Sequence, residues 1–196
     1  DVLGSRGLGD VYKRQILAVS LLALVACTPE KKQEADYSQY VNPMIGTDFT
    51  GNTYPGAQVP FGMVQLSPDN GLPGWDRISG YFYPDTTIAG FSHTHLSGTG
   101  AGDLYDISFM PVTRPYKEAP APLGIYSTFS HNDEAASAGY YRVLLKDYNI
   151  NVELTATERC GIQRYTFPEA EASVFLNLKK AMNWDFTCLL YTSDAA

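Results

Sequence analysis

The chain has 196 residues and a formal net charge of −7, and 44% of its residues are hydrophobic, including 14 tyrosines and 9 phenylalanines. This is enough apolar material for the core of one domain, so disorder over most of the chain is excluded. The acidic balance excludes nucleic acid as an expected partner, because an acidic surface repels phosphate backbones. No basic helix or patch indicates electrostatic attachment to a membrane.

The two ends of the chain have no period typical of a helix or strand. Residues 1–15 read DVLGSRGLGDVYKRQ, and residues 187–196 break off after a more regular run at 181–186. Both resemble non-native sequence read through from a library or an assembly, so they are excluded from fold reasoning. We expect the natural protein to continue well past Phe186.

An apolar run at 16–27 follows Lys13 and Arg14. It is shorter than the roughly 20 residues that a helix needs to cross a bilayer, and it is typical of an export signal. Its ending, LVAC, resembles a bacterial lipobox in which Cys27 is lipidated; the alternative is a buried helix or strand. The charged segment 28–38 is expected to be a flexible tether. These features predict an exported bacterial lipoprotein with its acyl chain in a membrane.

Residues 39–186 are predicted to form strands almost throughout. Runs that favour strands lie at 61–67, 79–84, 88–93, 104–112, 125–131, 140–148, 150–158, 160–167 and 173–178. In 150–158 apolar and polar residues alternate, as in a sheet with one wet face. Strands at this spacing predict an all-β fold, an antiparallel β-sandwich or barrel. Only 131–138 and 178–183 are compatible with short helices, and Pro111 suggests a strand edge or end.

The loops between residues 45 and 106 are rich in Gly, Asp, Asn and Ser and carry the candidate chemistry. Trp75 and Asp76 suit a sugar, since an indole packs on the C–H face of a pyranose and a carboxylate accepts hydrogen bonds from hydroxyls. The alternative is that Trp75 is a core residue and Asp76 a turn residue. The glycines free the backbone for close approach of a ligand, or they only close turns.

His93 and His95 form a His-x-His pair. On an extended segment both side chains point to one side, and with Asp103 or Asp106 they could bind zinc or iron. The alternative is that one or both histidines brace the loop or hydrogen-bond a ligand hydroxyl.

Paired carboxylates are the usual machinery of glycoside hydrolysis. Four aspartates are candidates, Asp69, Asp76, Asp103 and Asp106, but spacing selects no two of them as an acid–base couple. Cys160 is expected to be a small buried hydrophobe, because a single thiol makes neither an intrachain disulfide nor a Cys-based metal site.

Several motifs together resemble the amino-terminal domain of glycoside hydrolase family 92. They are YVNPMIGT at 40–47, TYPGAQVPFGMVQLSPD at 53–69, GWDRISGYFY at 74–83, FSHTHLSGTG at 91–100 and the segment 138–167. The resemblance runs in order from about Tyr40 to Trp184. It implies an exo-acting, calcium-dependent α-mannosidase that inverts the anomeric centre and acts on mannose-containing glycans. It also implies a Gram-negative bacterium as the source, and hence a periplasmic or cell-surface lipoprotein.

The resemblance further implies a supersandwich-like amino-terminal domain that packs on a larger (α/α) barrel. The general acid, the general base and the calcium ligands lie in that barrel, so no catalytic or metal-binding residue is expected in this chain. The resemblance assigns substrate contacts to Trp75 and Asp76 and then to Gly51, Asn52 and His95. This chain alone is expected to be inactive. Rival predictions are a stand-alone carbohydrate-binding sandwich and a His-x-His metallohydrolase.

Overall fold

The computed structural model describes residues 35–98, 104–120 and 123–177. The chain divides into two compact units, Asp1–Asp36 and Tyr37–Ala196, and nearly all the described residues belong to the second. The predictions for 1–15, for the signal at 16–27 with Cys27, for most of the tether at 28–38 and for 187–196 lie outside the described residues. In the described ranges, no helix is both long and apolar enough to span a bilayer.

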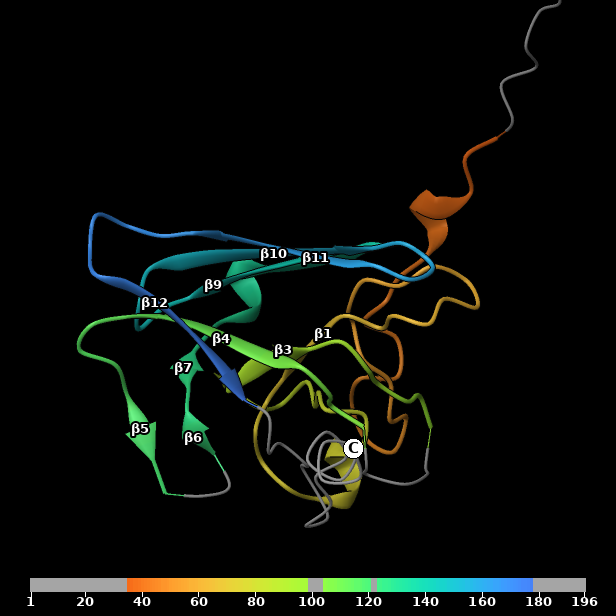
Figure 1. Ribbon diagram of the computed structural model, residues 1–196. Helices are drawn as coiled ribbons and strands as arrows, with labels where there is room; N and C mark the ends of the chain where they lie inside the picture. Colours follow the sequence, from red (N-terminus) through yellow and green to blue (C-terminus); the bar gives the residue numbers. More distant parts are fainter. Residues whose placement is uncertain (1–34, 99–103, 121–122, 178–196) are drawn as a thin grey trace, which may run out of the picture. The chain divides into compact units, whose positions relative to one another are not determined.

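Two four-stranded antiparallel sheets form the framework of the second unit, as layers of a β-sandwich (Figure 1). The first sheet has the order β1 (Ser67–Asp69), β3 (Gly90–Ser92), β4 (Ser108–Thr113) and β12 (Ala172–Asn177). The second has the order β11 (Gly161–Thr166), β10 (Ile150–Ala156), β9 (Tyr140–Leu145) and β8 (Glu134–Ser137). The predicted all-β antiparallel fold is confirmed.

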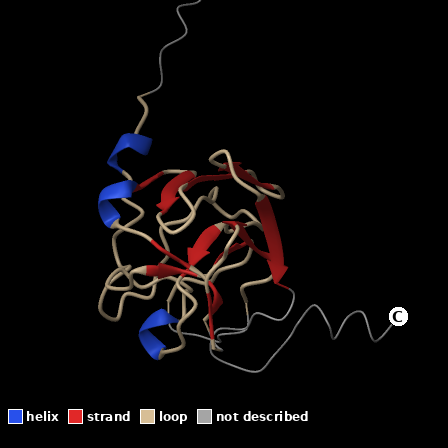
Figure 2. Ribbon diagram, turned by 90° about the vertical axis from the view of Figure 1, so that its left-hand side faces the viewer, coloured by secondary structure: helices blue, strands red, loops and turns tan. Residues whose placement is uncertain are grey.

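Short elements complete the described part. Strands β2 (Thr87–Ile88) and β7 (Ser127–Thr128) form one small sheet, and β5 (Glu118–Ala119) pairs with β6 (Gly124–Ile125). The described residues also form single-turn 3₁₀ helices outside the sheets, drawn in blue in Figure 2: η1 (Ser38–Tyr40), η2 (Trp75–Arg77) and η3 (His131–Asp133). Most of the described residues before β4 are therefore loop.

The core lies between the sheets and is densest under β9 and β10. Ile150, Val152 and Leu154 are fully buried, whereas Asn151 and Glu153 between them are not. The predicted alternation is thus confirmed. Each such aliphatic side chain contributes about 1.5–3 kcal/mol on burial.

Three predictions about elements are wrong. Of 61–67, only Ser67 belongs to a strand; Leu66 forms an isolated bridge to Ala57. Residues 79–84 contain no strand. The segment 131–138, the possible helix, is one 3₁₀ turn followed by β8.

Pro111 is not at a strand end but inside β4, between β3 and β12. Strand β3 pairs with β4 only through Phe91 and Phe109. One side of β4 therefore has no ladder partner at Pro111, and a residue without an N–H is tolerated there.

Cys160 is exposed, so its predicted burial is wrong. It lies in the turn between β10 and β11, where its N–H donates to the Thr157 hydroxyl at 3.2 Å and its carbonyl accepts from Thr157 N–H at 2.8 Å. A turn of this kind exposes the side chain that a strand would have buried.

Candidate functional site

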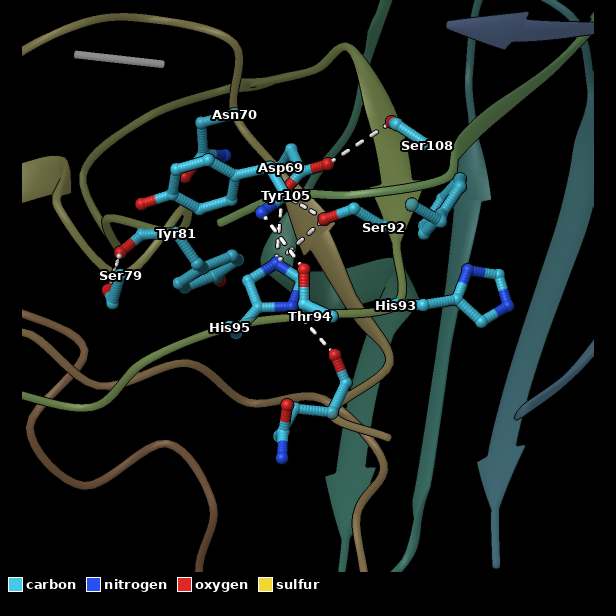
Figure 3. A network of polar contacts seen from close by, with 12 residues as sticks. Asp69, Asn70, Ser79, Tyr81, Ser92, His93, Thr94, His95, Tyr105 and Ser108 are labelled. Atoms are coloured by element: carbon cyan, nitrogen blue, oxygen red, sulfur yellow. Dashed lines mark hydrogen bonds and ion pairs between the residues drawn. The ribbon is translucent and has the colours of Figure 1, made fainter. Parts of the chain in front are cut away.

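A buried pair, His95 and Asp69, lies at the centre of the loop-rich end of the first sheet (Figure 3). His95 Nε2 is 2.9 Å from Asp69 Oδ1, and His95 Nδ1 is 2.7 Å from the carbonyl oxygen of Gln65. Both side chains are fully buried. Because both ring nitrogens already have protein partners, His95 braces the loop that follows β3.

Three adjacent strands supply the polar side chains around this pair. Asp69 ends β1, Ser92 ends β3 and Ser108 begins β4. The Ser92 hydroxyl donates to Asp69 Oδ1 at 3.0 Å, and the Ser108 hydroxyl donates to Asp69 Oδ2 at 3.3 Å. Such a network is rigid, because breaking any one of its hydrogen bonds leaves a buried polar group without that partner, which costs free energy.

Gly80 lets a loop approach this network closely. Its φ is +91°, and a Cβ there would lie 2.9 Å from Tyr105 Cε1, 3.0 Å from Asp69 Oδ1 and 3.0 Å from His95 Cδ2. No other residue fits without displacing these groups. The Tyr105 hydroxyl also donates to the carbonyl of Ile78, which ties the 75–80 loop to the network.

The predicted loops meet around this network. The Ser79 hydroxyl donates to the carbonyl of Thr53 at 3.0 Å, and Gly98 N–H donates to the carbonyl of Asn52 at 2.6 Å. Gly51 lies so close to Gly46 that a Cβ would be 2.2 Å from the Gly46 carbonyl oxygen. Segments 46–54, 75–80 and 95–98, far apart in the sequence, are therefore neighbours.

Asn52 has an unusual environment within this cluster of loops. Its side chain is buried, its φ is +49°, and its Oδ1 has no hydrogen-bond partner in the described part of the chain. A buried acceptor without a partner costs about 1–3 kcal/mol. Asn52 Oδ1 is therefore a buried acceptor without a hydrogen-bond partner among the described residues.

Trp75 and Asp76 are both exposed on η2, with 61% of Trp75 accessible to solvent. The alternative that Trp75 is a core residue is therefore wrong. The turn is held by Arg77, which forms two hydrogen bonds of 2.6 and 2.5 Å with the Asp85 carboxylate and lies over the Phe82 ring. The indole is thus presented to solvent on an anchored turn.

A pocket of about 380 Å³ lies beside these loops; Val41, Ile45 and Pro60 give it apolar walls, and Tyr54, Gln58 and Ser97 add polar groups. The Tyr54 hydroxyl donates to Gln58 Oε1 at 2.6 Å, and the Tyr54 ring lies 5.0 Å from the His95 ring. Burial raises the pKa of Tyr54 to about 12, so its hydroxyl stays neutral near pH 7. The pocket offers neutral hydrogen-bonding groups, as polyhydroxylated ligands require.

His93 and His95 do not converge. In Figure 3 the two rings extend in opposite directions: His95 toward Asp69, and His93 toward β11. His93 Nδ1 is 2.9 Å from the Ile107 carbonyl oxygen, and Asp106 accepts from the Thr94 hydroxyl at 3.3 Å. No group of three or more His, Cys, Asp or Glu side chains able to hold a metal occurs among the residues that the structure describes. Asp103 lies outside them.

Comparison with known proteins identifies the chain. Residues 40–195 match the family model described as the glycosyl hydrolase family 92 N-terminal domain. The chain belongs to glycoside hydrolase family 92. The match includes most of 187–196, and the origin of those residues stays a prediction.

Solved family 92 structures resemble this fold. A family 92 α-mannosidase of Bacteroides thetaiotaomicron, also solved with mannoimidazole, is 45% identical over 72% of this chain, with a TM-score of 0.68. An inverting family 92 mannosidase of the same species is 31% identical over 73% of the chain, with a TM-score of 0.59. An uncharacterized secreted glycosidase of Arthroderma benhamiae is 27% identical over 77% of the chain. The chain spans about a fifth of the length of each of these relatives.

The roles of several buried polar residues in this family 92 domain were not predicted from the sequence. Ser92 and Ser108 lie inside strand-like runs, and nothing local marks them as partners of Asp69. Glu134, assigned to a possible helix, accepts hydrogen bonds from the hydroxyls of Tyr81 and Tyr141 at 3.0 and 2.6 Å. Burial, followed by the charge of Glu134, raises the pKa of both tyrosines. The one feature of the sequence that could have indicated these buried residues is a polar residue within an otherwise apolar strand pattern.

Proposed function

We propose that this chain is part of an exported α-mannosidase that removes terminal α-mannosides from glycans with inversion. Support comes from family 92 membership and from relatives described as an α-mannosidase and an inverting mannosidase. The activity belongs to a longer protein, since the chain spans about a fifth of those relatives. Export is supported by the signal-like run at 16–27 and by a relative described as secreted. Anchoring through an acyl chain on Cys27 is part of the same proposal.

Within that enzyme, this domain forms part of the rim of the subsite for the terminal mannose. The observation that carries the proposal is the exposed Trp75–Asp76 pair on a turn fixed by the Arg77–Asp85 ion pair. The indole would pack on the sugar ring, and the Asp76 carboxylate would accept hydrogen bonds from its hydroxyls.

Asn52 and Gly51 would complete the contacts. The buried Asn52 Oδ1, without a partner in the described residues, would accept a ligand hydroxyl, and Gly51 keeps the backbone compact beside it. His95 would act indirectly: it fixes the position of the loops through Asp69 and the Gln65 carbonyl rather than contacting the sugar.

The cleavage chemistry requires groups outside the described residues. In an inverting glycosidase one carboxylic acid protonates the glycosidic oxygen and a carboxylate activates water on the opposite face of the sugar. Calcium, which the family resemblance implies, needs several oxygen ligands. The described residues contain no cluster that fits it, so calcium would be held elsewhere in the longer enzyme.

The test compares this chain with a chimera. In the chimera, residues 40–177 replace the matched segment of the 45% identical B. thetaiotaomicron α-mannosidase. We expect the chimera to release mannose from a mannobiose, and we expect purified residues 28–186 to release none. Mannose release by residues 28–186 alone would contradict the proposal that the cleaving groups lie elsewhere in the longer enzyme.

Titration calorimetry separates this proposal from a stand-alone carbohydrate-binding domain. We expect little or no heat when mannose or a mannobiose is added to residues 28–186, because half of the subsite is absent. Saturable binding by the isolated domain, abolished by Trp75→Ala, would favour the stand-alone binding function instead.

A further inference from the structure

We propose that His131 is a positioning residue for the turn at η2, which carries the proposed sugar contacts. Its imidazole ring, with a proton on both nitrogens, joins the buried carboxylate of Glu134 to the segment 82–85. That segment in turn fixes Arg77 of η2. What the turn binds rests on the proposed function, whereas the protonated ring and its link to the turn do not.

Both ring nitrogens of His131 face an acceptor. Nδ1 lies 2.6 Å from Glu134 Oε2, and Nε2 lies 2.7 Å from the carbonyl oxygen of Tyr83. An unprotonated ring nitrogen presents a lone pair, so a short contact with an acceptor oxygen needs a proton on the nitrogen. A neutral imidazole has one such proton and can make only one of these two bonds. The pair of contacts therefore indicates an imidazolium ring.

Glu134 is the acceptor in these contacts. Its side chain has no exposed surface, and it accepts hydrogen bonds from the hydroxyls of Tyr81 and Tyr141 as well as from His131. Both hydroxyls keep their protons near pH 7, because burial, followed by the charge of Glu134, raises the pKa of both tyrosines. Hydrogen bonds to a carboxylate favour its charged form. The proton between Glu134 and His131 is therefore assigned to the ring.

The other charges near His131 are already compensated. Asp85 pairs with Arg77 at 2.5 Å, and Asp133 pairs with Lys146 at 3.6 Å. Within the described chain, His131 is the only basic side chain that forms an ion pair with Glu134. The titratable groups on the elements around the ring include Tyr81, Tyr83, Asp85, Asp133, Glu134, Tyr141 and Lys146. The charge of Glu134 thus favours a positive ring at His131.

Tyr83 holds the ring through its side chain as well as its carbonyl. The two rings stack with centroids 3.9 Å apart and planes inclined by 8°. The face of an aromatic ring is negative, so it attracts a positive imidazolium more strongly than a neutral imidazole. The proton on His131 therefore strengthens two contacts with the same residue.

Segment 82–85 connects this contact to the turn at η2. Asp85, two residues after Tyr83, accepts two hydrogen bonds from Arg77 at 2.6 and 2.5 Å. The Arg77 guanidinium also lies 4.8 Å from the centre of the Phe82 ring. The segment is thus held by His131 on one side and holds Arg77 on the other. A shift of the segment would move Arg77, which follows the two proposed sugar contacts directly in η2.

This link depends on pH in one direction. While the ring is protonated, both bonds of His131 are present. When the pH rises and one proton leaves, the remaining proton stays on Nδ1, beside the charge of Glu134. Nε2 then faces the Tyr83 carbonyl oxygen with a lone pair, so an attraction becomes a repulsion. We expect the hold on segment 82–85 to be lost as the pH rises.

Nitrogen-15 NMR of the histidine rings in this chain tests the protonation directly. The two ring nitrogens of an imidazolium have similar shifts, whereas those of a neutral tautomer are far apart. The chain has three histidines, and His131→Gln assigns the signal of His131. We expect protons on both nitrogens of His131 near pH 7. A neutral ring near pH 7 would overturn the proposal.

Kinetics of the chimera test the link to the turn. Glutamine is neutral and donates at one end only, so we expect His131→Gln to lower kcat/KM for a mannobiose about tenfold, mainly through KM. We expect this difference from the parent chimera to shrink as the pH rises, because the parent ring then loses its proton. His93→Gln is the control, since His93 contacts the Ile107 carbonyl and points toward β11. Equal kcat/KM for His131→Gln and the parent in an active chimera would contradict the link.

Amide hydrogen exchange in this chain makes the test independent of catalysis. Tyr83 N–H donates to the Thr47 carbonyl at 2.8 Å. We expect it to exchange about tenfold faster in His131→Gln, with the amides of β10 unchanged. If His131→Gln does not fold, the native chain gives the same readout, since raising the pH should speed Tyr83 relative to β10. Unchanged exchange at Tyr83, or equal acceleration at Tyr83 and in β10, would overturn the proposal. A chimera that releases no mannose would instead count against the proposed function.

Discussion

Asp69 has no exposed surface, and the donors that reach its two oxygens include the ring of His95 and the hydroxyls of Ser92 and Ser108. Removing the carboxylate leaves all three buried without their acceptor. We expect Asp69→Ala to lower the free energy of unfolding by about 3–5 kcal/mol, measured by urea denaturation.

Asp69→Asn is the matched control, because the amide keeps an acceptor oxygen, and we expect it to cost less than Asp69→Ala. A loss below about 1 kcal/mol for Asp69→Ala would contradict the structural role of this network.

Glu153 offers a pH test at the surface of β10. Hydrogen bonds from Arg164, at 2.6 and 2.5 Å, and from the Tyr140 hydroxyl, at 2.6 Å, lower the pKa of Glu153 from 4.5 to about 2. Because the folded-state pKa is lowered, this stabilisation is fully present above pH 4.5 and is lost as the pH falls toward 2.

We expect an NMR titration of the Glu153 carboxylate to show the low pKa, and Arg164→Gln to raise it toward 4.5. Arg142→Gln, at the position opposite Glu153 on β9, is the control and should have a smaller effect. An unchanged Glu153 pKa in Arg164→Gln would contradict the assigned cause.

The sequence indicated the chemistry of single residues but not how those residues lie relative to one another. Trp75 and Asp76 are exposed, as a ligand contact requires. His95 was named as a sugar contact, but its partners Asp69 and Gln65 are 26 and 30 residues away in the sequence. Spacing along the chain cannot show that both ring nitrogens are already used.

At the level of elements, Gly80 and Gly98 form a natural pair for comparison, since both have φ of +91°. Alanine at either position incurs the cost of a left-handed backbone, about 1–2 kcal/mol. A Cβ at Gly98 meets nothing within 4 Å in the described chain, whereas one at Gly80 presses on Tyr105, Asp69 and His95.

We therefore expect Gly80→Ala to destabilise the domain by about 1–3 kcal/mol more than Gly98→Ala, in thermal or urea unfolding. Equal losses would mean that the contacts around Gly80 yield easily and that the loop is not fixed by them.

Strands with regular ladders were predictable, whereas 79–84 was not, for a reason visible in its hydrogen bonds. Phe82 N–H donates to the side chain of Asn70 at 2.6 Å, and Tyr83 N–H donates to the Thr47 carbonyl at 2.8 Å. The Asn70 amide in turn donates to the Thr87 carbonyl at 2.7 Å. A buried asparagine thus takes the place of a neighbouring strand, and strand propensity does not detect such a substitution.

At the scale of the whole molecule, the fold class followed from turn spacing and alternation, but the arrangement of the loops around Asp69 and His95 did not. Segments 46–54, 75–80 and 95–98 meet only because β1, β3 and β4 are adjacent in one sheet and bring Asp69, Ser92 and Ser108 together. The family motifs covered these segments as separate runs, without indicating which of them touch.

The most direct test of the account is kcat/KM for mannose release by the chimera carrying Trp75→Ala. Loss of the indole should lower kcat/KM by about 10- to 100-fold, because its packing on the terminal sugar is lost while the fold is retained. Ile162→Ala, an equally exposed apolar residue on β11, is the control and should leave kcat/KM unchanged. A folded Trp75→Ala chimera with kcat/KM equal to that of the parent would contradict the assignment of this domain to the mannose site.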